Sequence, residues 1–202
     1  MRLLISCLAL SLCAAGARAE TVSPQALADA VGFLAVSSGE AASAAILTYR
    51  RHGAGFTPLG ALDLRDARFA EGRFLVLARE GDFARIVTHP ASGGGVWVDL
   101  GGLRRSSWTT TLTLLEDLSG VQERIDVFSL YPAEARPACP APGRMEVCPA
   151  FARTDLGPLR ILAQRGDYIQ VGRETGDGLP GSPVGWVPIH DDAGRLSVWL
   201  VR

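Results

Sequence analysis

The sequence predicts a mainly β protein built from two similar small barrels and preceded by a short helical segment. Three observations predict this fold class. The stretch from Leu77 to Val87 returns 85 residues later, from Leu162 to Gly172, with a Gly-Asp-aromatic motif in both copies. From Phe56 onward, short alternating apolar runs are broken by Gly, Pro and Asp, as in strands and turns. Before Phe56, apolar residues recur at helical spacing instead.

The first residues, MRLLISCLALSLCAAGARAE, have the pattern of a secretory signal peptide. One cation, Arg2, precedes an apolar run from Leu3 to Ala15 that is too short to span a bilayer. Ala17-Arg18-Ala19 is the small-x-small pattern of a signal-peptidase site. We expect residues 1–19 to be removed and the protein to be periplasmic or secreted.

The charge of the exported chain limits its partners. Loss of Arg2 and Arg18 leaves 18 basic and 21 acidic residues, a formal net charge of −3. This balance supplies no basic surface for nucleic acid. No later apolar segment is long enough to cross a bilayer. We expect neither a nucleic-acid partner nor a membrane span after signal cleavage, and the oligomeric state is open.

Residues 20–54 are predicted to form a helical N-terminal segment. Ser23 and Pro24 supply a capping residue and a proline suited to the first helical turn. The apolar residues that follow at helical spacing are Leu27, Ala30, Val31, Leu34 and Ala35. A second helix is predicted over Glu40 to His52, because three cations fall in its last turn and Gly53 can cap it. The run AILTY within it is also compatible with a strand.

Residues 55–118 and 119–202 are predicted to form two domains with the same order of strands. The first copy reads ALDLR, RFLVLA, FARIV, VWVDL and SWTTTLTL, and the second reads RIDVFSL, LRILA, YIQV, GWVPI and RLSVWLV. In each copy a Gly-Asp pair between two apolar runs predicts a tight turn, and we expect the aromatic residue that follows to point into the core from the next strand. We therefore expect each copy to form one small barrel.

These units resemble bacterial SH3 (SH3b) domains. Gly81-Asp82-Phe83 and Gly166-Asp167-Tyr168 match the central hairpin turn of that family, and Gly185-Trp186-Val187 matches its next strand. In the first copy, Leu62-Asp63-Leu64-Arg65 stands in the place of the family's first strand. The resemblance implies two tandem five-stranded SH3-like barrels in an envelope protein. Such domains bind peptidoglycan peptides or other proteins and usually do no chemistry.

Each copy departs from the family pattern at one strand. The first copy reads Gly95-Val96-Trp97-Val98 where the family has Gly-Trp-Val. The second copy reads Ile125-Asp126-Val127-Phe128 in its first strand and lacks the arginine.

Cysteine use is consistent with export. Cys7 and Cys13 belong to the predicted signal peptide, which leaves Cys139 and Cys148 in the exported chain. Two cysteines close in sequence in a secreted protein predict a disulfide. The alternative is a pair of metal ligands, but zinc needs two more ligands and no histidine lies close in sequence.

The chain shows no recognisable catalytic or metal-binding motif. His52, His89 and His190 lie outside patterns such as H-E-x-x-H. Ser106 and Ser107 lack the flanking glycines of a nucleophile elbow. We therefore expect no catalytic residue, no metal and no cofactor.

The second barrel is the predicted binding unit. Ten residues separate Leu64 from Phe74 in the first copy, whereas 32 separate Val127 from Leu159 in the second. A loop this long is usually functional or disordered. It contains Tyr131 and both cysteines, and we expect Tyr131 and Trp186 to face each other across a groove, with Tyr168 as a weaker candidate. The alternative is that the insertion only covers barrel edges.

The four tryptophans recur in register between the copies, at Trp97 and Trp108 and at Trp186 and Trp199. This recurrence favours the core or a seam between domains, although one or two rings at the rim of a peptide groove are the alternative.

The function that the sequence favours is a non-catalytic exported binding module for peptidoglycan peptide or an envelope protein. One alternative is a structural or assembly protein whose two barrels pack as one rigid body. Another is a small cell-wall hydrolase or inhibitor, in which His190 would be needed for activity.

Overall fold

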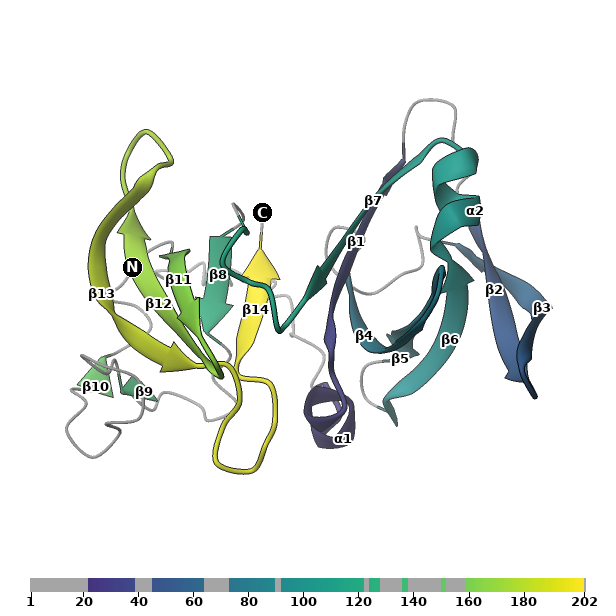
Figure 1. The fold of residues 1–202 in the computed structure, drawn as a ribbon, viewed down its shortest axis with the longest axis horizontal. Coiled ribbons are helices and arrows are strands. Elements are labelled where there is room, and N and C mark those ends of the chain that lie inside the picture. The colour runs from purple at the N-terminus through teal and green to yellow at the C-terminus, as the bar shows by residue number, and fades with distance from the viewer. Residues whose placement is uncertain are drawn as a thin grey trace, which may run out of the picture.

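A computed structural model describes residues 22–38, 45–63, 73–89, 92–121, 124–127, 136–137, 150–151 and 159–201. Within these residues the protein is mainly β, with two larger sheets that lie side by side and two short helices (Figure 1). Neither helix is long and apolar enough to cross a membrane. The predicted signal peptide lies outside the described residues.

The first sheet contains seven strands and is not a closed barrel. Its strands are β1 (Gly32–Ser38), β2 (Ala45–His52), β3 (Gly55–Asp63), β4 (Arg73–Glu80), β5 (Phe83–His89), β6 (Gly94–Asp99) and β7 (Trp108–Leu114). They are antiparallel in the order β3-β2-β6-β5-β4-β1-β7. Helix α1 (Pro24–Ala28) precedes β1, and helix α2 (Leu100–Arg105) joins β6 to β7.

The second sheet contains five antiparallel strands in the order β13-β12-β11-β8-β14. They are β8 (Arg124–Val127), β11 (Leu159–Arg165), β12 (Tyr168–Glu174), β13 (Pro180–Pro188) and β14 (Val198–Val201). Two short strands, β9 (Arg136–Pro137) and β10 (Ala150–Phe151), pair with each other in a separate sheet.

Five strands of the first sheet repeat the order of the second. β6-β5-β4-β1-β7 corresponds to β13-β12-β11-β8-β14, strand for strand. We call the part from α1 to β7 the first unit and the part from β8 to β14 the second unit. Each unit has an insertion between its first two common strands. The hairpin of β2 and β3 lies in the first insertion, and β9 and β10 lie in the second.

The repeated Gly-Asp motif forms the same turn in both units, as predicted. Glu80 pairs with Phe83 across it in the first unit, and Arg165 pairs with Tyr168 in the second. Gly81 and Gly166 both have a φ of 57°, while the following aspartates have negative φ. A two-residue hairpin with glycine at positive φ in its first position has the form of a type II′ turn.

The register shifts at matching places as well. The pairing of β4 with β5 shifts between Val76 and Ala78, and that of β11 with β12 shifts between Ile161 and Ala163. Both shifts fall at the leucine of the repeated stretch, Leu77 or Leu162. The repeat therefore encodes a bulged hairpin and not only a turn.

The predicted N-terminal helix is wrong beyond Ala28. Gly32–Ser38 forms β1, which lies between β4 and β7. Phe33 and Leu34 are both fully buried although they project from opposite faces of this strand. A strand buried on both faces has a continuous apolar sequence, and such a run cannot be distinguished from a buried helix by periodicity.

The predicted helix from Glu40 to His52 is also wrong over its described part. Ala45–His52 forms β2, which pairs with β3 and with β6. Gly53, with a φ of 58°, makes the turn between β2 and β3 and does not cap a helix. Ile46, Thr48 and Tyr49 are β-branched or aromatic, which favours a strand. β1 and β2 thus precede the expected boundary at residue 55 but belong to the first sheet.

The resemblance implied that Leu62-Asp63-Leu64-Arg65 forms the first strand of the first barrel. The structure does not place Leu62 and Asp63 there. Leu62 and Asp63 lie in β3 and pair with β2, and Leu64 and Arg65 lie outside the described residues. The position of the first strand, on the side of β4 away from β5, is occupied by β1. In the second unit, β8 does occupy the predicted first position, beside β11.

A seam of direct contacts joins the two units. The ring of Trp199 in β14 packs edge-on against Phe33 in β1, with centroids 5.2 Å apart. The Leu196 N–H donates to the Leu27 carbonyl at 2.9 Å. Gln164 binds the connecting segment, because its amide donates to the Leu115 carbonyl and accepts from the Leu118 N–H. Buried residues of both units form one hydrophobic cluster.

Candidate functional site

Two of the predicted binding residues, Tyr168 and Trp186, lie together on the outer face of the second sheet. In β12 and β13, Tyr168 pairs with Pro188 and Gln170 pairs with Trp186, so these four side chains project from the same face. Ile169, Val171 and Val187 project from the opposite face and are fully buried. Tyr168 and Trp186 are partly exposed, so the prediction that the aromatic residue after the Gly-Asp turn points into the core is wrong for Tyr168.

Arg165 completes this aromatic face. It pairs with Tyr168 across the Gly166-Asp167 turn, and its guanidinium carbon lies 6.0 Å from the centroid of the Trp186 ring. This distance suits a cation–π interaction. Arg165 itself is exposed. We call Arg165, Tyr168, Gln170 and Trp186 the open face, and it offers two rings and one positive charge to solvent.

The first unit has an equivalent face with a different charge. The 85-residue offset aligns Glu80 with Arg165 and Phe83 with Tyr168, and Trp97 occupies in β6 the position that Trp186 has in β13. Phe83 and Trp97 lie on the outer side of β5 and β6, and the intervening Ala84 and Val98 are fully buried. We call Glu80, Phe83, Arg85 and Trp97 the covered face, after the hairpin that contacts it; Trp97 is buried, Phe83 is partly exposed, and Glu80 and Arg85 are exposed.

The hairpin of β2 and β3 packs on the covered face. Phe56 stacks on Phe83 with ring centroids 3.9 Å apart and an angle of 11° between the planes. Phe56 also contacts Trp97 at 5.0 Å, and Tyr49 contacts Phe83 edge-on at 5.3 Å. Arg51 donates to the Glu80 carboxylate at 3.0 Å. Trp97 is consequently buried, with 8% of its surface exposed.

The two units also differ at the edge of the sheet. In the first unit, β2 adds to β6, where Tyr49 pairs with Trp97 and Thr48 pairs with Val98. In the second unit, β12 is the one hydrogen-bonded neighbour of β13 within the described residues. β13 has prolines at 180, 183 and 188, which lack an N–H for a further ladder. The stretch from Val184 to Val187 contains no proline, and no described strand pairs with its outer edge.

The remaining predicted site residues cannot be compared with the fold. Tyr131, Cys139 and Cys148 lie outside the described residues. The predicted contrast in loop length, however, is wrong. The insertion after the first common strand covers residues 39–72 in the first unit and 128–158 in the second, so it is long in both. The sequence comparison had started the first unit at β3 and thereby counted its insertion as an N-terminal segment.

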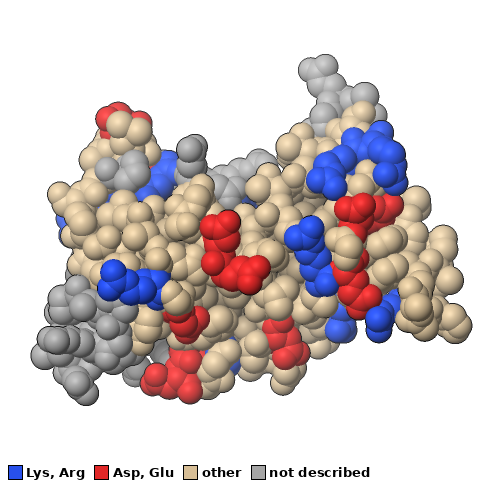
Figure 2. Space-filling model, viewed as in Figure 1, with Lys and Arg blue, Asp and Glu red and all other residues tan. Residues whose placement is uncertain are grey.

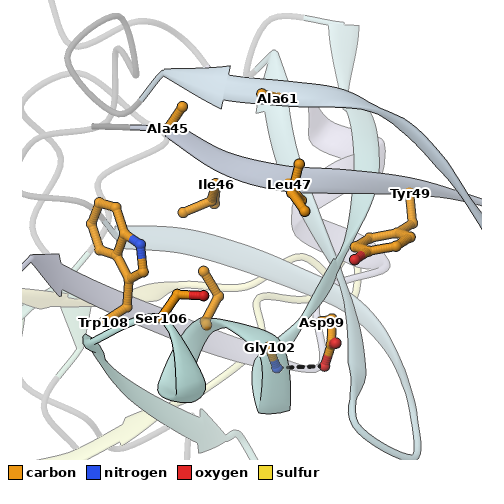
Figure 3. A pocket seen from close by; sticks show the side chains of 10 residues that line it. Ala45, Ile46, Leu47, Tyr49, Ala61, Asp99, Gly102, Ser106 and Trp108 are labelled. Atoms are coloured by element: carbon orange, nitrogen blue, oxygen red, sulfur yellow. Dashed lines mark hydrogen bonds between the residues drawn. The ribbon is translucent and has the colours of Figure 1, made fainter. Parts of the chain in front are cut away.

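A cavity of about 360 Å³ lies in the first unit between β2 and α2 (Figure 3). Ile46 and Leu47 line it from β2, and Trp108 and Tyr49 stand at its two ends. On the α2 side, the Gly102 N–H donates to the Asp99 carboxylate at 2.8 Å, which caps the helix. Its lining is largely apolar, and the Asp99 carboxylate on its wall is engaged in the cap.

Acidic and basic side chains lie side by side over α2 (Figure 2). Arg105 pairs with Asp99 at 3.3 Å and Arg104 pairs with Asp82 at 3.7 Å. These exposed pairs balance each other's charge and leave no local excess that would attract an ionic ligand.

A second cavity of about 460 Å³ lies beside the segment that connects the units. His190 Nδ1 lies 2.5 Å from the Asp167 carboxylate on its wall. Ser119 lines the same cavity, but its hydroxyl donates to Asp117. Within the described residues, the histidine–carboxylate pair thus has no hydroxyl or thiol in hydrogen-bond contact that would act as a nucleophile. The pair joins the Gly-Asp turn to the segment after β13.

Asp191 has a structural role in the next turn. Burial raises the pKa of its carboxyl, but hydrogen bonds from the Arg195 side chain and from the N–H groups of Arg195 and Ala193, together with the Arg195 charge, hold the pKa below its usual value. Among the described residues, no three His, Cys, Asp or Glu side chains are grouped to hold a metal ion.

The other tryptophans are structural. Trp108 is buried, with 5% of its surface exposed, and Trp199 lies in the seam. The sequence analysis missed Arg165. The signal that could have identified it is the alignment of the two copies, in which Arg165 takes the position of Glu80. No protein-family model matches the chain, and comparisons with curated proteins and with solved structures give no significant match.

Proposed function

We propose that the protein is a non-catalytic binding module of the periplasm or envelope, and that it binds an envelope protein through the open face of the second unit. One observation carries this proposal. In the first unit the protein's own hairpin packs on this face and Trp97 is buried, whereas its counterpart Trp186 is partly exposed in the second unit; Phe83 and Tyr168 are partly exposed in both. A face that accommodates a peptide ribbon in one copy is suited to accommodate a peptide segment in the other.

The proposal includes an SH3-like identity for both units. Its support is the common strand order, the bulged hairpin with its Gly-Asp turn, and the Gly-Trp-Val sequence in β13. The open first sheet departs from a closed barrel because β2 and β3 extend it beyond β6. Export is supported by the sequence of residues 1–19 alone.

A binding experiment with matched variants tests this function. The purified protein is immobilised and challenged with detergent-solubilised envelope proteins and, separately, with purified sacculi. We expect Trp186→Ala to remove retention of specific envelope proteins. Leu179→Ala, which alters another exposed apolar side chain of the second unit, should retain them.

Three results contradict the proposal. Retention that is the same for both variants and the wild type would remove the open face from the function. Binding to sacculi alone would replace the protein partner with a peptidoglycan peptide. Hydrolysis of sacculi that is lost in His190→Ala would favour an enzyme. Folding of each variant is checked by circular dichroism.

The seam supports a second candidate, an assembly protein in which both units act as one body. Phe33 and Trp199 pack together, and the Leu196 N–H reaches the Leu27 carbonyl. These contacts, together with Gln164, restrict independent motion of the units. Equal binding by the isolated second unit and by the whole chain would argue against a need for this rigidity.

A further inference from the structure

The contacts that fill the covered face define the chemistry of what the open face would bind. This inference rests on the proposed function, because it concerns the same surface. In the first unit the occupying strand is β2, which is antiparallel to β6 and places Tyr49 opposite Trp97. Tyr49 reaches Phe83 from there. Two residues further along β2, Arg51 binds Glu80.

The open face keeps the aromatic part of this arrangement. Tyr168 takes the place of Phe83, and Trp186 takes the place of Trp97 on the strand that would receive the new neighbour. Among the described strands, none pairs with the outer edge of β13 at Trp186 and Val187, the positions that correspond to those at which β6 pairs with β2. Strand addition supplies main-chain hydrogen bonds, and the side chains that alternate along the strand supply specificity.

The open face inverts the charge. Arg165 stands where Glu80 stands in the first unit, so a strand in the position of β2 needs a carboxylate where β2 has Arg51. A second arginine there would face Arg165 and be repelled. Within the described residues Arg165 makes no ion pair, and its guanidinium lies over the Trp186 ring.

We propose that the open face binds an extended segment of a partner protein that adds antiparallel to β13 with an aromatic residue opposite Trp186 and a carboxylate two residues later that pairs with Arg165. The described strands of the second insertion, β9 and β10, pair with each other and not with β13. A partner segment is therefore the occupant that the described residues leave room for.

Two synthetic peptides test this proposal. Both span residues 45–63, the β2–β3 hairpin. One has the native sequence AILTYRRHGAGFTPLGALD, and the other carries Arg51→Glu. Affinity for the purified protein is measured by titration calorimetry. We expect the Glu peptide to bind about tenfold more tightly than the native peptide, because attraction to Arg165 replaces repulsion. A Glu peptide that also carries Tyr49→Ala should bind more weakly.

A charge reversal in the protein provides the matched control. Arg165→Glu should reverse the preference, so that the native peptide binds more tightly than the Glu peptide. Arg160→Glu, at another arginine of β11 whose own partner is Glu174, should leave the preference unchanged. Trp186→Ala should weaken binding of both peptides. Since the comparison is between peptides on one folded protein, a moderate loss of stability does not affect it.

The outcomes that overturn the proposal are distinct from those that overturn the function. Equal affinity of the two peptides, or no binding of either, would contradict the proposal that the open face binds a strand with an aromatic residue and a carboxylate. If envelope proteins are nevertheless lost with Trp186→Ala, the binding function stands and another recognition mode applies. If Trp186→Ala also retains the envelope proteins as the wild type does, both the proposed function and this inference are wrong. A Tyr168→Ala variant as unstable as Phe83→Ala would show that the chain's own insertion covers the face, and would also overturn the proposal.

Discussion

In the first unit the β2–β3 hairpin packs on Phe83 and Trp97, and Trp97 is buried, whereas in the second unit its counterpart Trp186 is partly exposed; Phe83 and Tyr168 are partly exposed in both. The strands that carry these rings have the same order, turn and bulge in both units. The rings therefore differ in their contacts with the described part of the insertion between the first two common strands. The β2–β3 hairpin contacts them in the first unit, whereas β9 and β10 pair with each other and not with β13 in the second.

The charge at the end of each face differs in a corresponding way. Glu80 is neutralised by Arg51 of the hairpin, while Arg165 has replaced the carboxylate in the second unit. If the second unit only repeated the first, its insertion would need an acidic residue in the place of Arg51. Under the proposed function, this inversion means that the two faces would accept segments of opposite charge.

The largest expected difference between the units concerns the aromatic side chains themselves. Phe83→Ala removes a stacked ring and an edge contact, so we expect a loss of about 2–3 kcal/mol in the free energy of unfolding. Tyr168→Ala should cost less than about 1 kcal/mol, because no ring covers Tyr168 within the described residues. Urea denaturation of both variants measures the difference. Equal losses would mean that both faces are covered.

The turns should respond alike, because they are alike in structure. Gly81→Ala and Gly166→Ala each place a Cβ on a residue with a φ of 57°, although nothing lies within 4 Å of that Cβ. Backbone strain should therefore cost about 1–2 kcal/mol in each unit. Gly120→Ala is the control, since its surroundings are also open and its φ is not positive. A cost confined to one of the two turns would contradict their equivalence.

The connections before the last strand differ and should differ in pH dependence. The first unit uses α2, and the second uses the turn held by Asp191, whose side chain is 11% exposed. Asp191→Asn should cost about 1–2 kcal/mol at neutral pH, because charge-assisted hydrogen bonds from Arg195 are lost.

The sign of the pH effect follows from the lowered pKa of Asp191. A carboxyl with a lower pKa in the folded state stabilises it fully above the usual carboxyl range, and this contribution is lost as pH falls through the folded-state value. The difference between wild type and Asp191→Asn should therefore shrink below about pH 4. Asp192→Asn, at the exposed neighbour, is the control. A difference that grows on acidification would contradict this account.

The smallest expected effect is that of the Arg51–Glu80 pair. Its side chains are 51% and 41% exposed, so a double-mutant cycle should give a coupling of about 0.5 kcal/mol or less, and less at high salt. Arg165→Ala should hardly change stability. A larger loss with Arg165→Ala than with Arg51→Ala would indicate that Arg165 has a structural partner.

The repeated hairpin could be predicted because its chemistry is local. Gly81, Gly166 and the flanking apolar runs specify a two-residue turn whatever surrounds them, and the structure confirms it. Tyr168 and Trp186 were predicted from the family resemblance and the long loop, as residues of a groove that Tyr131 would share. The structure places Tyr168 and Trp186 on one face, because side chains alternate along β12 and β13, whereas Tyr131 lies outside the described residues.

The first strand of the first unit was missed because its character depends on tertiary contacts. Phe33 is buried against Trp199 of the other unit and Leu34 within its own unit, so β1 has no alternating pattern. That error moved the start of the unit to β3 and hid the equivalence of the two insertions. The contact between Phe56 and Phe83 was also unpredictable, because β3 and β5 are not neighbours in the sheet and β2 and β6 lie between them.

The central claim is that the edge and face of the second sheet are open where those of the first are filled. Amide hydrogen exchange, resolved by residue with NMR, tests this at Trp97 and Val98 against Trp186 and Val187. Successive N–H groups of a strand point to opposite sides, so both amides in β6 have a neighbouring strand, while one of the two in β13 faces an edge. We predict at least about tenfold faster exchange at that amide of β13 than at its counterpart in β6. Equal protection at the two positions would show that the edge of β13 is already occupied, and would contradict the account.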